Sequence, residues 1–229
     1  MATKNEEKIF YIQRPLPEDV ALDNMKMPVI KAINEEVSDL EHLSPINFQS
    51  LDKKKDNRKK LVLNFRNDDK LERLWTHSLD YIPLIASCGA VVTPDYSVSS
   101  SMNPYWMDQY IFRNRYLGCL WQSYGAKVIP SIAWDTPETF DICFSGVEPG
   151  GIVCVSTLGV GRNLDVFEAG YEEMKKRLHP STVILYGDFK PNMSGKFYHV
   201  KYTDPFVLKI PYEQISLFPQ SKIFAREVH

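Results

Sequence analysis

The chain has 229 residues, with 27 basic and 29 acidic side chains and a hydrophobic fraction of 44%. This length is typical of one large α/β domain, and the near balance of charge excludes a global field that pulls the protein onto nucleic acid or membrane. No apolar run approaches the ~18 residues of a spanning helix, and the N-terminal segment lacks the apolar stretch of a signal peptide. We therefore expect a cytoplasmic protein with no membrane partner.

The four cysteines, at positions 88, 119, 143 and 154, are widely spaced and lie in apolar surroundings. No C-x-x-C pair of the kind that binds metal is present. Their pattern indicates reduced core residues of a cytosolic protein rather than a catalytic thiol.

The first 60 residues predict an N-terminal extension with a short strand at 28–33 and a basic loop. The loop spans residues 53–60 and holds six basic side chains in eight positions. Such a run is usually a solvated loop, and the alternative is a contact with nucleic acid or a protein partner.

From residue 61 the sequence alternates buried-looking strands with amphipathic helices. In the first helix, Asp68 is the expected N-cap and Pro83 predicts a break or kink. The expected strands lie at 61–65, 90–93, 127–133, 152–156, 182–186 and 197–203. The expected helices lie at 68–88, at 104–124, from Thr136 onward, and at 164–178.

This alternation predicts an α/β fold with a mainly parallel sheet. About five units are too few for a complete barrel of eight, so a Rossmann-like open sheet is preferred and a partial β/α barrel is the alternative. We divide the chain into the extension at 1–60, an α/β core at 61–204, and a C-terminal tail at 205–229 that packs on the core.

Ligands of parallel α/β folds bind at the carboxyl ends of the strands, so the polar residues there are the candidate site. After the second strand of the core, Asp95 is surrounded by Thr93, Tyr96 and Ser97. A carboxylate at this position can bind Mg²⁺ or act as a general acid or base, and we predict Asp95 as the catalytic candidate. Asp135 and Asp188 are the other strand-end aspartates; capping of the turn after Pro94 is the alternative for Asp95, and capping of the next helix is the alternative for Asp135.

A second candidate lies between the strand at 152–156 and the helix that follows. Ser156, Thr157, Gly159 and Arg162 could hold a phosphate, because hydroxyls, glycine amides and a helix N-terminus all favour an anion. The segment is neither a dinucleotide fingerprint nor a Walker loop. The alternative is a glycine-rich turn that serves only strand-to-helix packing.

Other candidates are weaker. Trp134 could stack on a planar ligand or be a core aromatic, and Arg66, Arg113 and Arg115 could clamp an anion or extend to solvent. The five histidines are scattered, and no Ser-His-Asp arrangement, G-x-S-x-G elbow or H-x-x-x-H pair is present. This pattern disfavours hydrolysis by a histidine-activated nucleophile, and it predicts no protein-held metal cluster.

Several segments together resemble an uncharacterised domain-of-unknown-function family (DUF4417-like) found in Firmicutes, their phages and their mobile elements. The matching segments are Val92–Ser97, Arg113–Gly118, Lys127–Trp134, Phe144–Gly146, Val155–Gly159 and Leu185–Gly187. The resemblance implies no activity. It favours Thr93, Asp95, Ser156, Thr157, Gly159 and Tyr186 as site residues, and it suggests a replication accessory or counter-defence protein.

Three functions remain open. The first is binding of a phosphorylated or nucleotide-like small molecule at the strand ends, as in a counter-defence protein that sequesters a nucleotide signal. The second is a Mg²⁺-dependent enzyme that uses Asp95 on a phosphoester or glycosidic bond. The third is a nucleic-acid or protein contact through the basic loop. Whether the protein is an enzyme, and whether it needs any cofactor beyond possible Mg²⁺, is left open by the sequence.

Overall fold

The computed structural model describes residues 4–33, 37–161 and 163–202. The helices are α1 (Lys4–Gln13), α2 (Val37–Glu41), α3 (Asp68–Thr76), α4 (Ser78–Ala86), α5 (Pro104–Ser123), α6 (Phe140–Cys143) and α7 (Leu164–Leu178), with 3₁₀ turns η1 (Phe48–Ser50) and η2 (Pro137–Thr139). The strands are β1 (Ser44–Asn47), β2 (Lys60–Leu63), β3 (Ala90–Val92), β4 (Val128–Ile129), β5 (Ile152–Ser156), β6 (Thr182–Tyr186) and β7 (Phe197–Val200).

The strands form two sheets that are each parallel throughout, in the orders β1-β2-β3-β4 and β5-β6-β7. The chain just after β4 joins them, because Ser131 forms a parallel bridge with Cys154 of β5. Two backbone hydrogen bonds of 2.8 Å, from the Ile132 amide to the Cys154 carbonyl and from the Cys154 amide to the Pro130 carbonyl, support this bridge. All seven strands therefore follow one another in space in the order in which they occur in the sequence.

The mainly parallel α/β fold with alternating strands and helices is confirmed. Within the described residues β1 and β7 form no ladder with each other, so the sheet is open. Its order is sequential, however, and lacks the reversal that creates the switch point of a doubly wound sheet. This order is the one that the alternative of a partial β/α barrel implies.

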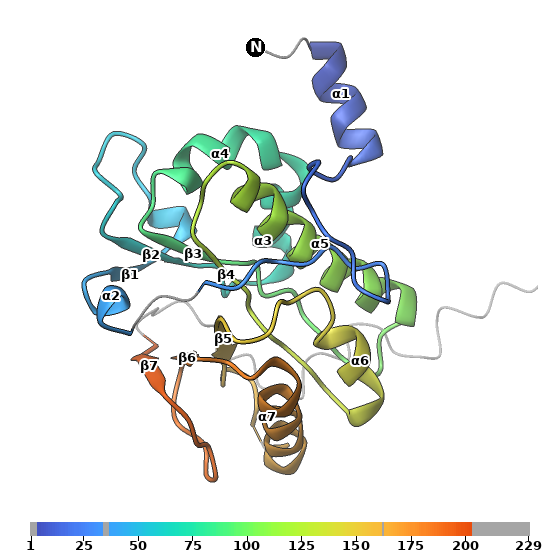
Figure 1. The fold of residues 1–229 in the computed structure, drawn as a ribbon, viewed down its shortest axis with the longest axis vertical. Coiled ribbons are helices and arrows are strands. Elements are labelled where there is room, and N and C mark those ends of the chain that lie inside the picture. The colour runs from blue at the N-terminus through green and yellow to red at the C-terminus, as the bar shows by residue number, and fades with distance from the viewer. Residues whose placement is uncertain (1–3, 34–36, 162, 203–229) are drawn as a thin grey trace, which may run out of the picture.

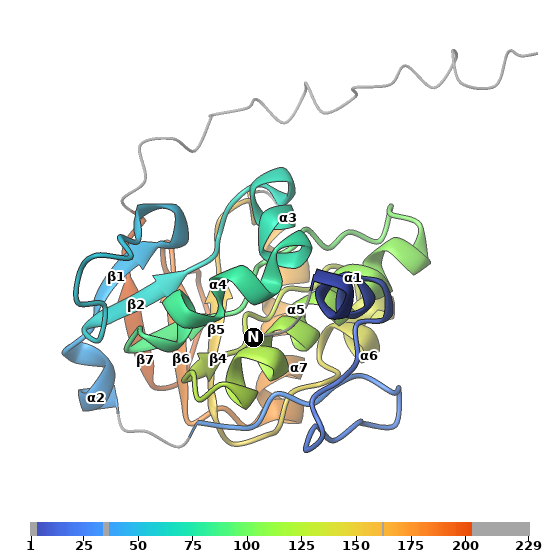
Figure 2. The ribbon, with the colours of Figure 1, turned by 90° about the horizontal axis from the view of Figure 1, so that it is seen from above.

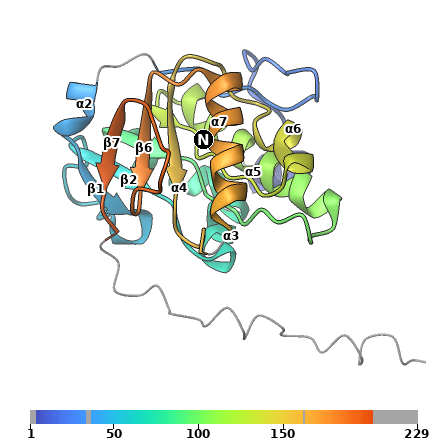
Figure 3. The same ribbon diagram turned by 90° about the horizontal axis from the view of Figure 1, so that it is seen from below.

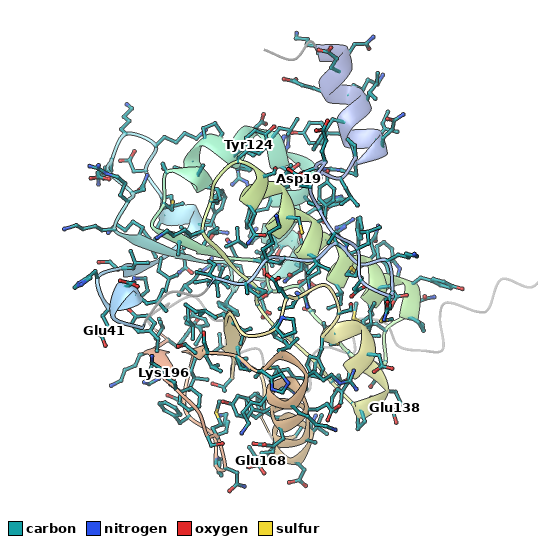
Figure 4. All side chains as sticks on the ribbon, in the orientation of Figure 1. Asp19, Glu41, Tyr124, Glu138, Glu168 and Lys196 are labelled. Atoms are coloured by element: carbon teal, nitrogen blue, oxygen red, sulfur yellow. The ribbon has the colours of Figure 1, made fainter. Side chains whose placement is uncertain are left out.

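The inward faces of the strands share one apolar cluster, which shows how strongly the sheet curves. It takes Leu61 and Leu63 from β2, Cys154 from β5 and Ile184 from β6, all at most 3% exposed. Tyr198 of β7 donates a 3.3 Å hydrogen bond to the carbonyl oxygen that precedes β1. Figure 4 accordingly shows Glu41 of α2 and Lys196, just before β7, on the same side of the molecule.

The outward faces of the same strands are covered by helices. Helices α3, α4 and α5 lie over β2 and β3 (Figures 1 and 2). Val62 of β2 and Val91 of β3 belong to an apolar cluster with residues of these helices. Val153 of β5 and Val183 of β6 belong to the cluster of α6 and α7, and Figure 3 shows α7 beside these strands. Strands buried on both faces are expected to be continuous runs of apolar residues, as these are.

The helix expected over 68–88 is two helices, and the break lies at His77 rather than at Pro83. The carbonyl oxygen of Trp75 would accept the helical bond from the Leu79 amide, but it accepts one from Arg14 instead, at 2.8 Å. The Leu79 amide donates to the Tyr11 hydroxyl at 3.2 Å. The break is thus made by two side chains of the N-terminal segment, and Pro83 is accommodated inside α4.

The expected cap of the first helix is also different. Asn67 occupies the N-cap position without a side-chain hydrogen bond, and Asp68 is the first residue of α3. The helix over 104–124 is confirmed as α5, where the Asn103 side chain accepts a 3.0 Å bond from the Tyr105 amide. Gly125 follows α5 with φ +83°, the left-handed conformation in which glycine commonly ends a helix.

Part of the N-terminal segment belongs to the folded body. Ile30 is 1% exposed, lies in the cluster under α5, and forms a parallel bridge with Val147. β1 pairs with β2 as an edge strand. The predicted tail at 205–229 lies outside the described residues.

The four cysteines are free; those at 119, 143 and 154 are buried and Cys88 is partly buried. Burial raises the pKa of Cys119 to about 12 and that of Cys143 to about 11, which disfavours the reactive thiolate at neutral pH. Within the described ranges, no helix combines the length and the apolar character needed to cross a membrane.

Gly170 allows α7 to pack against Trp134, and we expect Gly170→Ala to destabilise the fold. A Cβ atom at Gly170 would lie 2.1 Å from the indole ring. Overpacking costs about 1–3 kcal/mol and alanine gains about 1 kcal/mol of helix propensity, so the net loss is at most about 2 kcal/mol. Urea denaturation measures this loss. The exposed neighbour Ala169→Ser is the control, and equal stability of the two variants would contradict the packing argument.

Candidate functional site

The carboxyl ends of β2, β3 and β4 bring four polar residues into contact. Asn64 follows β2, Thr93 and Asp95 follow β3, and Ser131 follows β4. The Asp95 amide donates to the Asn64 carbonyl oxygen at 3.1 Å. The Asn64 side-chain amide donates to the Val92 carbonyl oxygen at 2.7 Å. The predicted location at the strand ends therefore holds a compact polar group around Asp95.

Asp95 has the most informative electrostatics of this group. Asp95 keeps some accessible surface, but the protein around its carboxyl group disfavours the charged form, and this desolvation raises the pKa of Asp95 to about 7. A hydrogen bond from the Ser131 hydroxyl and the positive charge of Arg115 lower the pKa, while the nearby Asp68 carboxylate raises it further. A carboxyl group of this kind exchanges a proton near neutral pH.

Ser131 connects Asp95 to a buried network. Its amide donates to the Thr93 hydroxyl at 2.8 Å, and the two hydroxyl oxygens lie 3.4 Å apart. The side-chain amide of Asn114, on α5, donates to the Ser131 hydroxyl at 2.9 Å and to the Pro94 carbonyl at 2.7 Å. Thr93, Ser131 and Asn114 are all buried, so they position Asp95 rather than face a ligand.

Arg115 is the buried cation of this network, and its side chain is 1% exposed. Its guanidinium donates to the side-chain oxygen of Asn114 at 2.6 Å and to the carbonyl oxygens of Ser131, Cys143 and Ser145 at 3.1, 2.7 and 2.8 Å. Burial lowers the pKa of Arg115 to about 10, so it keeps its charge at neutral pH. Arg115 ties α5 to the segment after β4 and to the end of α6.

Asn64 has an unusual unsatisfied atom. Its residue is 0% exposed, and its side-chain oxygen accepts no hydrogen bond within the part of the chain that the structure describes. Buried polar atoms without partners are uncommon and need a physical explanation. Asn64 is as buried as Thr93 and Asn114, so its side chain faces protein rather than a ligand.

Asp68 and Ser97 form the outer side of the group. The Ser97 amide donates to the Asp68 carboxylate at 3.0 Å, which fixes the loop after β3 to the start of α3. Two carboxylates, from Asp68 and Asp95, therefore lie at this edge. Mg²⁺ is commonly held by one or two carboxylates together with water and substrate phosphates, so these two residues are the ones that could hold it.

Three aromatic residues in the predicted site pack into the protein. Tyr96 is 3% exposed and stacks on a helical tyrosine, with ring centroids 5.3 Å apart. Tyr186 is also 3% exposed and stacks on Phe65 at 4.6 Å, inside the curved sheet. Trp134 stacks on Phe167 of α7 at 5.3 Å. These contacts correspond to the core or rim role that was the alternative for Trp134.

The predicted phosphate loop lies at the end of β5, beyond β4 as seen from Asp95. The Ser156 hydroxyl accepts a 3.1 Å bond from the Leu158 amide, and the Thr157 hydroxyl donates to the Asp188 carbonyl at 2.8 Å. Gly159 has φ +78° and open space where a Cβ atom would lie. Arg162 lies outside the described residues. The loop is separate from the Asp95 group. The ends of β3 and β5 are two strand spacings apart, or about 10 Å at ~4.8 Å for each spacing.

Other candidates lie elsewhere. Arg113 forms a 2.6 Å ion pair with Glu72, and the Asp135 carboxylate accepts a 2.6 Å bond from the Ser100 amide. No group of three or more His, Cys, Asp or Glu side chains suited to a metal ion occurs among the described residues. A hollow of about 300 Å³ is lined by Glu168, other residues of α7, and residues 191–193, away from Asp95.

Sequence reasoning identified Asp95 and missed the residues that define its environment. Asn64, Ser131 and Asn114 are ordinary polar residues in the sequence, and only their contacts reveal the network. The strand-end position of Asn64 and Ser131 was the available signal. Arg115 was predicted to clamp an anion or extend to solvent, but it is 1% exposed and donates to protein oxygens instead. Asn114 lies beside it in α5, and its role is detectable only from the tertiary structure.

The comparisons with known proteins identify a family. The model of a family described as a domain of unknown function (DUF4417) matches residues 24–204. The chain belongs to the DUF4417 family. That match begins well before residue 61, in agreement with the packing of Ile30 and β1 onto the body of the DUF4417 domain.

The DUF4417 protein is similar to two phage proteins, each of which is called Gene 1 protein. It is 34% identical over 126 residues to the Gene 1 protein of Mycobacterium phage D29, covering 54% of this chain and 47% of the relative. It is 32% identical over 129 residues to the Gene 1 protein of Mycobacterium phage L5, covering 55% and 56%. The chain thus spans about half the length of the curated relatives it matches, and both of these relatives are phage proteins. No solved structure matches it.

Proposed function

We propose that this DUF4417 protein binds a phosphorylated, nucleotide-like small molecule at the carboxyl ends of β3, β4 and β5. Asp95 would contact a hydroxyl or amino group of that molecule. The observation that carries the proposal is the position of Asp95: a carboxyl group with a pKa of about 7 at the strand ends, held by the buried Ser131. Perturbed carboxyl groups in such positions are typical of ligand and active sites.

The second part of the ligand would lie at the loop after β5. There the Ser156 hydroxyl, the open Gly159 and the first turn of α7 offer donors for a phosphate. The carboxylates of Asp68 and Asp95 repel an anion, so the phosphate belongs at β5 and the uncharged part belongs at β3. The separation of about 10 Å between these ends suits a molecule of nucleotide size.

An enzyme is the second candidate, and the pKa of Asp95 is the observation that favours it. A group that titrates near neutral pH is matched to general acid–base catalysis. The substrate would be a phosphoester or a glycosidic bond, with Mg²⁺ held by Asp68 and Asp95 if a metal takes part. Sequestration of a nucleotide signal, as in counter-defence, would use the same site without turnover.

The test is a thermal-shift and calorimetric screen of ribonucleoside monophosphates, ribonucleoside triphosphates and cyclic dinucleotides, with and without Mg²⁺. We expect one class to bind, and Asp95→Asn to weaken it about 10- to 150-fold, since a hydrogen bond to a charged group contributes about 1.5–3 kcal/mol. The exposed strand-end variant Asp188→Asn is the matched control. Equal losses in both variants, or no binding at millimolar concentration, would contradict the proposal.

Product analysis of the same mixtures separates the two candidates. Hydrolysis that is lost in Asp95→Asn and kept in Asp188→Asn would establish the enzyme. Tight binding with the ligand recovered intact would establish a binding protein.

A further inference from the structure

The basic loop of residues 53–60 is not used by the site at Asp95, and it concentrates positive charge. It carries six basic side chains and one acidic one in a chain of net charge −2, so the other residues carry a net charge of −7. The loop connects β1 to β2 at one edge of the molecule (Figure 1). A local field of opposite sign to the rest of the surface orients a charged partner toward that edge.

The loop has a defined conformation. Asn57 is 4% exposed, and its side-chain amide donates to the Asp52 carbonyl at 3.1 Å. Its own carbonyl accepts bonds from the Lys60 amide at 2.9 Å and from the Gly89 amide at 3.2 Å. A Cβ atom at Gly89 would lie 2.5 Å from the Arg58 carbonyl oxygen, so glycine is needed for this close approach. The lysines are therefore presented by a fixed backbone.

Asp56 of the loop and Asp52 just before it neutralise only part of the loop's charge. Lys55 pairs with Asp52 at 3.9 Å, and Arg58 pairs with Asp56 at 2.8 Å. Three further cations, on Lys53, Lys54 and Lys59, are exposed and form no ion pair within 4–33, 37–161 and 163–202. They are available to a partner.

A hollow lies next to the loop. It measures about 390 Å³, and its lining includes the cations Arg58 and Lys127, the acid Asp39, and the titratable side chains of His42 and Cys88. Gly89 precedes β3 and Lys127 precedes β4, so the hollow lies at the amino ends of the strands. This surface is thus at the opposite end of the strands from Asp95.

We propose that this surface, formed by the loop 53–60 and the hollow beside it, binds double-stranded nucleic acid through its phosphate backbone. Lysines are point charges suited to phosphates, and the loop holds no aromatic side chain on which single-stranded bases could stack. Lys127 and Arg58 also lie near the ends of α5 and α4, where cations stabilise helix C-termini. That role does not account for Lys53, Lys54 and Lys59.

The test measures fluorescence anisotropy of a labelled 20-base-pair DNA duplex at 50 and 200 mM NaCl. Three phosphate contacts predict a slope of about −2.7 in log affinity against log salt, or roughly a 40-fold loss over this range. The triple variant Lys53→Glu, Lys54→Glu, Lys59→Glu should lose binding at 50 mM NaCl. The control reverses three exposed lysines elsewhere, Lys4, Lys8 and Lys201, and should keep most of it.

Three results would overturn the proposal. They are the absence of saturable binding by the wild-type protein at 50 mM NaCl, an equal loss in both triple variants, and competition by polyglutamate as effective per charge as by unlabelled duplex. The last result would assign the surface to an acidic protein instead. Melting temperatures of both variants establish that they are folded. Asp95→Asn should leave duplex binding unchanged, so failure of this proposal and failure of the small-molecule site are separately visible.

Discussion

Asp95→Asn is expected to stabilise the protein most above pH 7, and by at most about 1.6 kcal/mol at pH 5. The pKa of Asp95 is about 7 in the folded protein, against an ordinary value of 3.8. Between these values the folded state holds a proton that the unfolded chain has released. The free energy of unfolding therefore falls as pH rises from about 4 to 7, and the full penalty applies above pH 7.

The size of this effect has an upper limit of about 4 kcal/mol, at ~1.4 kcal/mol for each pKa unit. Asparagine cannot ionise, and its amide resembles the protonated carboxyl group in shape and in hydrogen bonding. The penalty is thus removed in the variant. A residue that lowers stability in this way is typical of a site kept for function.

The measurement is the free energy of unfolding in urea from pH 5 to pH 8.5 for the wild type, Asp95→Asn and the control Asp188→Asn. Subtracting the wild-type profile from each variant cancels all other titrating groups. Asp95→Asn should give a difference that grows with pH and levels off above about 7.5. Parallel profiles for the wild type and Asp95→Asn would show that Asp95 ionises normally.

Arg115→Met is expected to destabilise the protein by about 3–5 kcal/mol. Methionine occupies a similar volume but donates no hydrogen bond. It would leave buried acceptors without donors at Ser131, Cys143, Ser145 and the side chain of Asn114. Because the same bonds hold Ser131 against Asp95, the variant should also disturb the ionisation of Asp95.

Arg177→Met is the matched control, because Arg177 also pairs at short distance but at the surface. Its guanidinium lies 2.6 Å from Asp141 and 2.7 Å from Glu173, with 36% of the side chain exposed. Exposed ion pairs contribute less than about 1 kcal/mol. Urea denaturation compares the two variants, and Arg115→Lys should be intermediate because it keeps the charge with fewer donors. Equal losses for Arg115→Met and Arg177→Met would refute the role of the buried network.

The elements that sequence predicted well are those with a complete local signal. The strands at 152–156 and 182–186 and the helix at 164–178 have the predicted bounds. Each strand is a continuous apolar run, and the helix has a clear apolar face with a polar one opposite. Neighbouring residues alone determine such patterns, so no knowledge of distant contacts was needed.

Distant contacts decided the features that sequence predicted wrongly or not at all. The break at His77 depends on Arg14 and Tyr11, which lie more than 60 residues earlier in the chain. The two sheets are joined through the bridge between Ser131 and Cys154, which lie 23 residues apart in the chain. Helix propensity and hydrophobic periodicity describe single segments. They cannot predict that a side chain from a distant part of the sequence will replace a hydrogen bond within a helix.

The candidate site shows the same division. From the sequence alone, the position of Asp95 after a buried strand placed it among the site residues, since parallel strands bring their carboxyl ends to one edge. The pKa of Asp95 was decided only by the tertiary structure, which buries the carboxyl group and sets Ser131, Arg115 and Asp68 around it. Burial and charge proximity are properties of packing between elements. The sequence by itself therefore determined where the polar residues lie, and the tertiary structure decided which of them interact.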